Sequence, residues 1–247
     1  MKAVGVIPAR WASTRLPGKV LVDIGGKPML QHVWERVKKS GRLADVIVAC
    51  DELHVVERAR GFGANAILTA KNHPSGSDRV AEAAAGTDAD IIVNIQSDEP
   101  FVRPQLIDKL VEALTQDLVP VVATPVKRVV SEVEFRNPNV VKVVLDNSWN
   151  ALYFSRAAIP FRRDGRPETW SSYFKHIGIY AYRRKFLFDF CKLPKAFLEQ
   201  EECLEQLRVL EAGYRIRCVE TDAETVGVDT PEDVVRAVNF MKENPGL

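Results

Sequence analysis

Three basic residues follow the first apolar segment of the chain closely enough to surround one anion. The segment Pro8–Lys19, PARWASTRLPGK, comes directly after the apolar run Ala3–Ile7 and contains Arg10, Arg15 and Lys19 among small residues. Such a loop can bring backbone N–H groups and cationic side chains around a polyphosphate. We therefore predict a polyphosphate site here, and the alternative is an ordinary solvated basic loop.

Two acidic segments offer ligands for a divalent cation. Asn94–Pro100, NIQSDEP, follows the apolar run Ile91–Ile95, and Gly227–Asp233, GVDTPED, lies near the end of the sequence. Carboxylate oxygens favour magnesium, and Asp98 and Asp229 are the candidates. Structural roles stay open for both, because Asp98 suits a turn and Asp229 could complement a helix dipole.

Two common nucleotide-binding motifs do not fit. Gly18 and Lys19 are followed by Val20, and the upstream glycine of a Walker A loop is missing. The sequence GFGANA, Gly61–Ala66, follows a predicted helix and precedes a predicted strand, which is the reverse of the dinucleotide-binding context. These observations disfavour a P-loop NTPase and a Rossmann dehydrogenase.

The composition of the chain excludes further classes of protein. The 247 residues contain 34 Lys and Arg against 33 Asp and Glu, which lacks the basic excess of a general nucleic-acid binder. No apolar run approaches the roughly 18 residues of a membrane span, and the first one is cut off by Arg10. The four cysteines form no C-x-x-C pair and the four histidines are scattered, so we expect reduced thiols and no zinc. We expect a soluble, cytoplasmic protein with no nucleic-acid or membrane partner.

These residues must be positioned by an α/β fold. Short β-rich runs alternate with amphipathic stretches, which predicts a Rossmann-like, mostly parallel sheet flanked by helices. Ligands of such sheets bind outside the carboxyl ends of strands, here after Ile7, after Ile95 and after a strand expected before Asp229. The predicted strands are Ala3–Ile7, Val46–Cys50, Ala66–Thr69, Ile91–Ile95 and Val121–Pro125, and the predicted helices are Met29–Ser40, Val55–Phe62, Asp78–Ala85 and Gln105–Leu114.

The alternation weakens after about Thr124. We predict a single domain, residues 1–247, with an inserted antiparallel sub-region at about 125–185. A final helix should begin with Thr230 as N-cap, Pro231 in the first position and Asp233 completing a capping box. The other predicted elements of this half are strands at Val140–Leu145, Ala151–Phe154, Ile177–Tyr182 and Arg215–Val219, and a helix at Leu198–Ala212 closed by Gly213.

Several motifs occur together in the order and spacing of one enzyme family. From Lys2 to about Val238 the chain resembles the 3-deoxy-manno-octulosonate cytidylyltransferases, or CMP-Kdo synthetases. The first loop marks only the wider sugar nucleotidyltransferase superfamily, whereas the later motifs are more specific. The motifs are Pro8–Lys19, SGSDR (Ser75–Arg79), QSDEP (Gln96–Pro100), NPNVVKVVLD (Asn137–Asp146), ALYFSRAAIP (Ala151–Pro160), KHIGIYAYR (Lys175–Arg183), LEQLRVLEAG (Leu204–Gly213) and GVDTPED (Gly227–Asp233).

The resemblance implies a reaction and its cofactor. CTP and 3-deoxy-manno-octulosonate (Kdo) would give CMP-Kdo and pyrophosphate with Mg²⁺, in lipopolysaccharide biosynthesis. Attack of the anomeric hydroxyl on the α-phosphorus needs positioning and charge neutralisation, so no side chain is assigned as general base. By the same resemblance Arg10, Lys19, Asp98 and Asp229 are catalytic, with Arg10 and Lys19 at the triphosphate, Asp98 and Asp229 at the metal, and Ser75, Arg79 and Gln96 near the cytidine.

The resemblance also assigns an acidic-sugar site. The planar fork of Arg156 suits the Kdo carboxylate. The other residues have structural alternatives, as core or strand residues or as exposed helix positions. The sugar-side set is Arg156, His176, Tyr180, Glu205 and Gln206.

One position departs from the family pattern, which reads Gln-Gly-Asp-Glu-Pro where this chain has Ser97 in place of the glycine. If the backbone there needs a positive φ, serine would cost about 1–2 kcal/mol. Otherwise its hydroxymethyl group could touch the nucleotide or the sugar, and the sugar preference stays open.

Three other interpretations compete with this one. The same chemistry could act on another acidic sugar, such as an amino-substituted Kdo or a sialic acid. The chain could instead be a nucleotide-binding regulatory module, which would need no acceptor site. It could also be a scaffold protein, which would need none of the three functional segments Pro8–Lys19, Asn94–Pro100 and Gly227–Asp233. The family also implies a homodimer, formed through the less regular region Asn137–Tyr182. By the same resemblance, the sub-region at about 125–185 would serve sugar binding and dimerisation.

Overall fold

The computed structural model describes residues 1–163, 169–224 and 226–244. Contacts along the chain divide it into two compact units. The first unit contains Met1–Asp108 and Ala223–Leu247, and the second contains Lys109–Asp222. Among the described residues no helix is long and apolar enough to cross a membrane.

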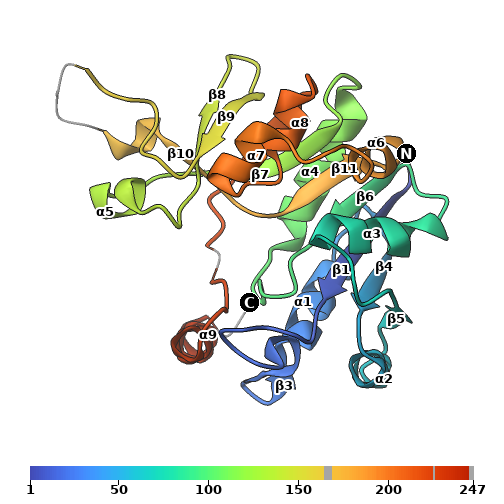
Figure 1. The fold of residues 1–247 in the computed structure, drawn as a ribbon. Helices are drawn as coiled ribbons and strands as arrows, with labels where there is room; N and C mark the ends of the chain where they lie inside the picture. Colours follow the sequence, from blue (N-terminus) through green and yellow to red (C-terminus); the bar gives the residue numbers. More distant parts are fainter. Residues whose placement is uncertain (164–168, 225, 245–247) are drawn as a thin grey trace. The chain divides into compact units, whose positions relative to one another are not determined.

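The first unit is built on a parallel sheet. Its strands are β1 (Ala3–Ala9), β4 (Leu43–Cys50), β5 (Asn65–Leu68) and β6 (Ile91–Asn94), in the order β5-β4-β1-β6. Every residue of β1 and β6 is buried, as expected for strands covered on both faces. Figure 1 shows these strands side by side, with α3 (Gly76–Ala85) lying across them.

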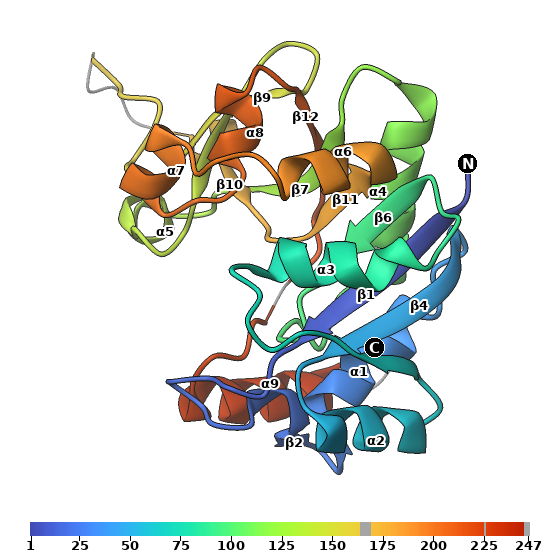
Figure 2. The same ribbon diagram turned by 45° about the vertical axis from the view of Figure 1, so that its right-hand side comes forward.

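Helices cover both faces of this sheet. In Figure 2, α3 lies on one face, and α1 (Met29–Val37) and α2 (Leu53–Gly61) lie on the other. β1, β4 and β5 follow one another toward one edge of the sheet, and β6 then pairs on the other side of β1. With right-handed crossovers, this reversal places α3 on the opposite face from α1 and α2. The unit also contains η1 (Lys19–Leu21), β2 (Asp23–Ile24), β3 (Lys27–Pro28) and α9 (Pro231–Glu243), and α4 (Pro104–Gln116) contains the boundary at Asp108.

The C-terminal helix belongs to the first unit because its apolar face packs there. Ala237 of α9 is buried in a cluster with Ile24, Met29 and Phe101. The rings of Phe101 and Phe240 lie 4.9 Å apart. This packing carries the last functional segment of the sequence back to the N-terminal strands.

The second unit is mixed and mainly antiparallel. Its central strand, β7 (Val122–Arg128), pairs antiparallel with β10 (Phe174–His176) and β11 (Tyr180–Arg183) and parallel with β12 (Ile216–Glu220). β8 (Lys142–Leu145) joins β10 to β9 (Ala151–Ser155). The remaining elements are α5 (Glu132–Arg136), η2 (Trp170–Ser172), α6 (Arg184–Phe190), α7 (Phe197–Glu202) and α8 (Leu207–Glu211).

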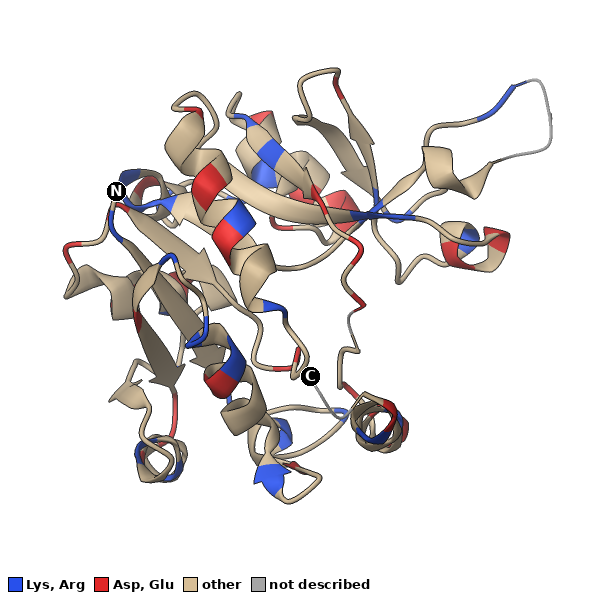
Figure 3. Cartoon of the chain, turned by 180° about the vertical axis from the view of Figure 1, so that it is seen from behind, with Lys and Arg blue, Asp and Glu red and all other residues tan. Residues whose placement is uncertain are grey.

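Charged residues of both signs are distributed over the helices rather than gathered on one element. Figure 3 shows basic and acidic positions interspersed on the helices. This agrees with the near-neutral formal charge of +1 and is typical of solvated helix faces.

The predicted fold class is confirmed. A parallel core flanked by helices is followed by antiparallel strands in the second half. The last helix begins as predicted, because the Thr230 side chain accepts from Asp233 N–H and Pro231 is the first helical residue. The expected sub-region at about 125–185 falls within the larger second unit, residues 164–168 of it lie outside the described residues, and the single domain stays a prediction.

Three predicted elements are wrong. Leu198–Ala212 is two helices, because α7 ends at Cys203, which adopts the left-handed conformation with φ 51°. Ile177–Tyr182 is not one strand: Ile179 N–H donates back to Ile177 O at 2.8 Å, and the Thr124 hydroxyl lies 2.8 Å from Ile179 O. The expected strand before Asp229 is also wrong, since residues 226–229 form an irregular segment.

Candidate active site

Lys19 joins the two acidic segments that the sequence singles out. Its Nζ lies 2.7 Å from Asp98 Oδ2 and 2.9 Å from Asp229 Oδ1. Gly18, with φ 67°, makes the turn that starts η1 and presents Lys19. Val228 N–H donates to Asp98 O at 3.0 Å, which ties the two acidic segments together. The predicted pairing of Asp98 with Asp229 in space therefore exists, although the second does not follow a strand.

Burial and neighbouring charges shift the pKa values of Lys19 and Glu99 in this cluster. Burial lowers the pKa of Lys19, but the charges and hydrogen bonds of Asp98 and Asp229 outweigh it, so the pKa is raised. Arg15 adds a second cation, with Nη2 3.1 Å from Asp229 Oδ2. Burial, and then the charges of Asp98 and Asp229, raise the pKa of Glu99 to about 8, so this carboxyl carries a proton at neutral pH.

The cap of α9 leaves the Asp229 carboxylate available for cations. Asp233 Oδ2 accepts hydrogen bonds from Asp229 N–H at 2.9 Å and from Thr230 N–H at 3.0 Å. The Thr230 hydroxyl accepts from Asp233 N–H and so caps the helix, which means that the cap needs no bond to the Asp229 side chain. The Asp229 side chain instead contacts Lys19 and Arg15.

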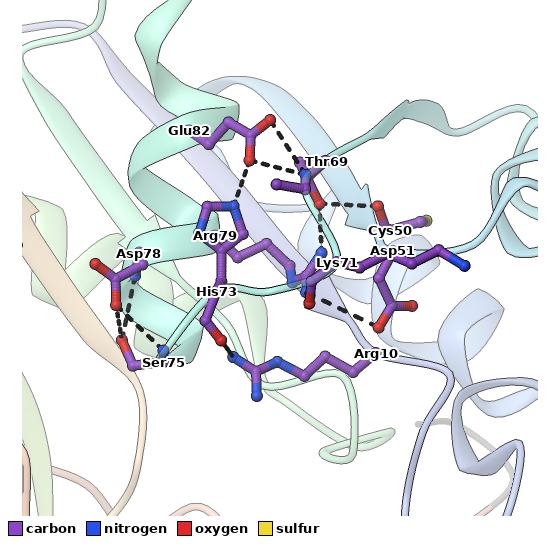
Figure 4. Close-up of polar contacts among 11 residues, drawn as sticks. Arg10, Cys50, Asp51, Thr69, Lys71, His73, Ser75, Asp78, Arg79 and Glu82 are labelled. Atoms are coloured by element: carbon purple, nitrogen blue, oxygen red, sulfur yellow. Dashed lines mark hydrogen bonds and ion pairs between the residues drawn. The ribbon is translucent and has the colours of Figure 1, made fainter.

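Two of the three residues assigned to the cytidine, Ser75 and Arg79, lie in one segment, residues 69–79, which we call the cytidine-side segment. Arg10 Nη2 donates to His73 O at 3.2 Å, as Figure 4 shows. Ser75 is the N-cap of α3: its hydroxyl donates to Asp78 Oδ2 at 2.7 Å and accepts from Asp78 N–H. Arg79 is fully buried, so it acts inside the segment rather than on an open surface.

Gln96 and Ser97 follow β6 directly. Gln96 is half-buried and Ser97 is 9% exposed. Ser97 is not among the described non-glycine residues with a positive φ, so the serine is not strained there. The alternative of a side-chain contact to the ligand is the one that stays open.

Arg156 lies at the junction between α7 and α8. Its guanidinium donates to Glu202 O at 2.8 Å, Pro138 O at 3.1 Å and Cys203 O at 3.4 Å. Its backbone N–H donates to the Glu202 carboxylate at 2.8 Å. Three carbonyls therefore already orient the guanidinium, which the sequence did not indicate.

The other sugar-side residues form a second group in the same unit. The rings of His176 and Tyr180 lie 5.3 Å apart, and the charge of Glu205 acts on the Tyr180 hydroxyl. Burial lowers the pKa of His176 to about 3, so its ring is neutral, with Nε2 2.9 Å from Thr124 Oγ1. Gln206 is not an exposed helix position: it is 5% exposed, and its Nε2 has no hydrogen-bond partner among the described residues.

Sequence reasoning missed two polar residues near these sites. Asp51 follows β4 directly, and applying the strand-end rule at Cys50 would have found it. Lys142 is fully buried and donates to Asn137 O at 2.9 Å and to Arg156 O at 2.7 Å. No local signal predicts that this strand lysine points inward.

The acidic cluster suits a small divalent cation bound together with phosphates. The described residues contain no group of three or more His, Cys, Asp or Glu side chains able to hold a metal. Magnesium is commonly held by one or two carboxylates plus substrate phosphates and water. Asp98 and Asp229, already converging on a cation, meet that requirement.

The fold and this site define a nucleotidyltransferase. A family model described as Cytidylyltransferase matches residues 4–216. At 14% identity and a TM-score of 0.65, 4-diphosphocytidyl-2C-methyl-D-erythritol synthase from Anaerococcus prevotii shares the fold alone. The chain is thus of the cytidylyltransferase class.

Its relatives specify the family. The 3-deoxy-manno-octulosonate cytidylyltransferase of Geotalea daltonii is 48% identical over 251 residues, covering 98% of this chain and 99% of that protein. That of Solibacter usitatus is 50% identical over 241 residues, covering 98% and 95%. A structure of CMP:2-keto-3-deoxy-manno-octonic acid synthetase complexed with CTP matches at 44% identity and a TM-score of 0.93, covering 99% of this chain and all of that one. The chain belongs to the 3-deoxy-manno-octulosonate cytidylyltransferase family.

Proposed function

We propose that the protein transfers CMP from CTP to Kdo, giving CMP-Kdo and pyrophosphate. The observation that carries the proposal is the convergence of Asp98 and Asp229 on Lys19, beside the basic loop Pro8–Lys19. The relatives that bear this activity in their names align over nearly the whole chain.

Arg10, Arg15 and Lys19 bind the triphosphate in this proposal. The Lys19 ammonium is held by two carboxylates in the protein alone, so a metal ion that takes over those carboxylates frees it for the phosphates. Arg15, on Asp229, can be released in the same way. The loop then neutralises charge on the leaving pyrophosphate, the main catalytic need of phosphoryl transfer.

Asp98 and Asp229 would hold magnesium. When bound, the metal supplies charge neutralisation at the phosphates and lowers the pKa of the attacking sugar hydroxyl. The two carboxylates orient toward one point, which the Lys19 ammonium occupies in the protein alone. No protein side chain is needed as general base.

The second unit carries the acidic-sugar site in this proposal. Arg156 offers its guanidinium to the Kdo carboxylate, with its orientation set by backbone carbonyls. Gln206 Nε2, which has no hydrogen-bond partner in the part of the chain that the structure describes, supports the assignment, because a buried donor without a partner is costly unless a ligand satisfies it. His176, Tyr180 and Glu205 offer hydroxyl-binding groups beside it.

We also infer a homodimer acting in the cytoplasm to supply lipopolysaccharide biosynthesis. Exposed apolar side chains in the sub-region support the dimer: Val133 of α5 is 82% exposed and Phe161 is 88% exposed. Exposed apolar side chains of this kind can contribute to an association surface. Val133→Asp should shift the sedimentation coefficient from dimer to monomer, and an unchanged dimer would contradict this surface.

The test is pyrophosphate release by the purified protein with CTP, magnesium and Kdo. The proposal predicts rapid release with Kdo, and little with UTP, because cytosine and uracil differ at a donor/acceptor edge that hydrogen bonds can read. Faster release with an amino-substituted Kdo or a sialic acid would change the acceptor sugar that we propose but not the reaction. Tight CTP binding without release for any acidic sugar would instead support a regulatory module.

A further inference from the structure

Asp51 faces both segments that the proposed CTP site uses. Its Oδ1 accepts a 2.9 Å hydrogen bond from Trp11 N–H, in the phosphate loop Pro8–Lys19. Its Oδ2 lies 3.8 Å from Nη2 of Arg79, in the cytidine-side segment. Figure 4 shows the Asp51 carboxylate beside that segment, between Arg10 and Thr69. One carboxylate therefore contacts one segment and pairs electrostatically with the other.

Arg79 anchors the cytidine-side segment from inside. Its side chain is fully buried, and Nη1 donates to Thr69 Oγ1 at 2.5 Å. The Thr69 hydroxyl in turn donates to Cys50 O at 2.8 Å, at the end of β4. A buried guanidinium needs a counter-charge, and Asp51, directly after Cys50, supplies one.

The phosphate loop is anchored at Trp11. A Cβ on Gly18 would lie 2.7 Å from the Trp11 ring, so the ring packs directly on the turn that presents Lys19. The ring also contacts His54 edge-on, with centroids 4.4 Å apart. Fixing the Trp11 backbone through Asp51 therefore restrains the opposite end of the loop as well.

We propose that Asp51 is a positioning residue that fixes the phosphate loop relative to the cytidine-side segment. The inference rests on the proposed function, since it concerns how that CTP site is held. A ligand that spans two rigidly related subsites gains from their fixed geometry, whereas a ligand of either subsite alone does not.

The test compares the affinity for CTP, which spans both subsites, with the affinities for CMP and for tripolyphosphate, each of which represents one part of CTP. Asp51→Asn keeps an acceptor for Trp11 N–H and removes the charge that faces Arg79. Calorimetric titration of the full chain in magnesium buffer should show CTP affinity reduced about tenfold or more. The affinities for CMP and for tripolyphosphate should each fall less than about threefold.

A buried pair of similar exposure provides the control. Arg208 Nε lies 2.7 Å from Glu199 Oε2 in the second unit, and both side chains are 10% exposed. Glu199→Gln should lower the melting temperature, as Asp51→Asn does, but leave the affinity for CTP unchanged. If Asp51→Asn does not fold, Asp51→Ser, which also keeps an acceptor and removes the charge, should show the same ligand pattern.

The outcomes separate the inference from the function on which it rests. Equal losses for CTP, CMP and tripolyphosphate, or an unchanged CTP affinity, would overturn the positioning role. Loss of CTP affinity in Glu199→Gln would also overturn it, because general destabilisation would then explain the effect. Failure of the unaltered protein to bind CTP would overturn the proposed function itself.

Discussion

In the proposed function, Arg156 is both a ligand group and a structural one. Its three carbonyl acceptors fix the guanidinium before any sugar arrives. Preorganisation of this kind reduces the entropy lost on binding. The same bonds mean that removing the side chain also loosens the α7–α8 junction.

Arg156→Ala should therefore weaken use of the acidic sugar and leave CTP binding nearly intact. A lost charge-assisted contact is worth about 1.5–3 kcal/mol, or roughly ten- to hundredfold in the KM for Kdo. Steady-state kinetics and CTP titration measure the two effects, and Arg215→Ala, which replaces an exposed arginine of the same unit, is the control. An unchanged KM for Kdo with weaker CTP binding would refute the assignment.

Ser97 should tolerate glycine, but without a gain in stability. Its φ is not in the left-handed region, so Ser97→Gly relieves no strain and should cost about 0.5–1 kcal/mol through the unfolded state. Chemical denaturation measures this, and Ser97→Ala isolates the hydroxyl. A changed preference between Kdo and an amino-substituted sugar in both variants would place the hydroxyl at the ligand, whereas a more stable glycine variant would contradict the absence of strain.

At the scale of secondary-structure elements, the first turn of α9 positions the backbone of Asp229. Its capping box holds the backbone of Asp229 through Asp233, while the apolar face of the helix packs on the N-terminal strands. Secondary structure thus positions a ligand residue that lies in no strand or helix itself.

Thr230→Ala should cost about 1 kcal/mol of stability and raise the magnesium concentration needed for half-maximal turnover. The cap is lost, and Asp229 is held less firmly toward Asp98. Ser131→Ala removes a comparable cap from α5, where the Ser131 side chain accepts from Glu134 N–H, and should leave the magnesium requirement unchanged. Identical magnesium titrations for both variants would count against the link between cap and metal.

The sequence predicts the elements whose pattern is local and regular. The buried strands of the first unit and the α9 cap follow from apolar runs and capping chemistry. The break between α7 and α8 falls at Cys203 rather than at a glycine, so the sequence does not indicate it. The turn at Ile177–Ile179 depends on the Thr124 hydroxyl of β7. In the site, the acidic pair follows from motif positions, and Asp51 is open to the strand-end rule because it follows β4 directly. The inward direction of Lys142 depends on tertiary contacts that no spacing reveals.

At the scale of the whole molecule, a buried neutral histidine makes stability depend on pH. Burial lowers the pKa of His176 to about 3, against 6.5 for an ordinary histidine. Below pH 6.5 the unfolded chain takes up a proton that the folded protein does not bind until about pH 3. The free energy of unfolding should therefore fall as the pH is lowered through this interval, by up to about 1.4 kcal/mol per pH unit from this residue.

His176→Gln should flatten that dependence between pH 6.5 and pH 4, as followed by urea denaturation at several pH values. Phe135→Leu, in the separate cluster around Tyr173, should lower stability without changing the slope. Equal slopes for the unaltered protein and His176→Gln would show that this histidine is not the source.

The central claim is that Asp98 and Asp229, far apart in sequence, act as one metal-dependent site. The most direct measurement is a double-mutant cycle of Asp98→Asn and Asp229→Asn, with turnover followed at saturating CTP while magnesium is varied. Each single variant should fold, retain some CTP binding and lose roughly a thousandfold or more in turnover, and the double variant should be little worse than the poorer single. Near-normal turnover in either folded single variant, or fully additive losses in the double, would contradict the shared site.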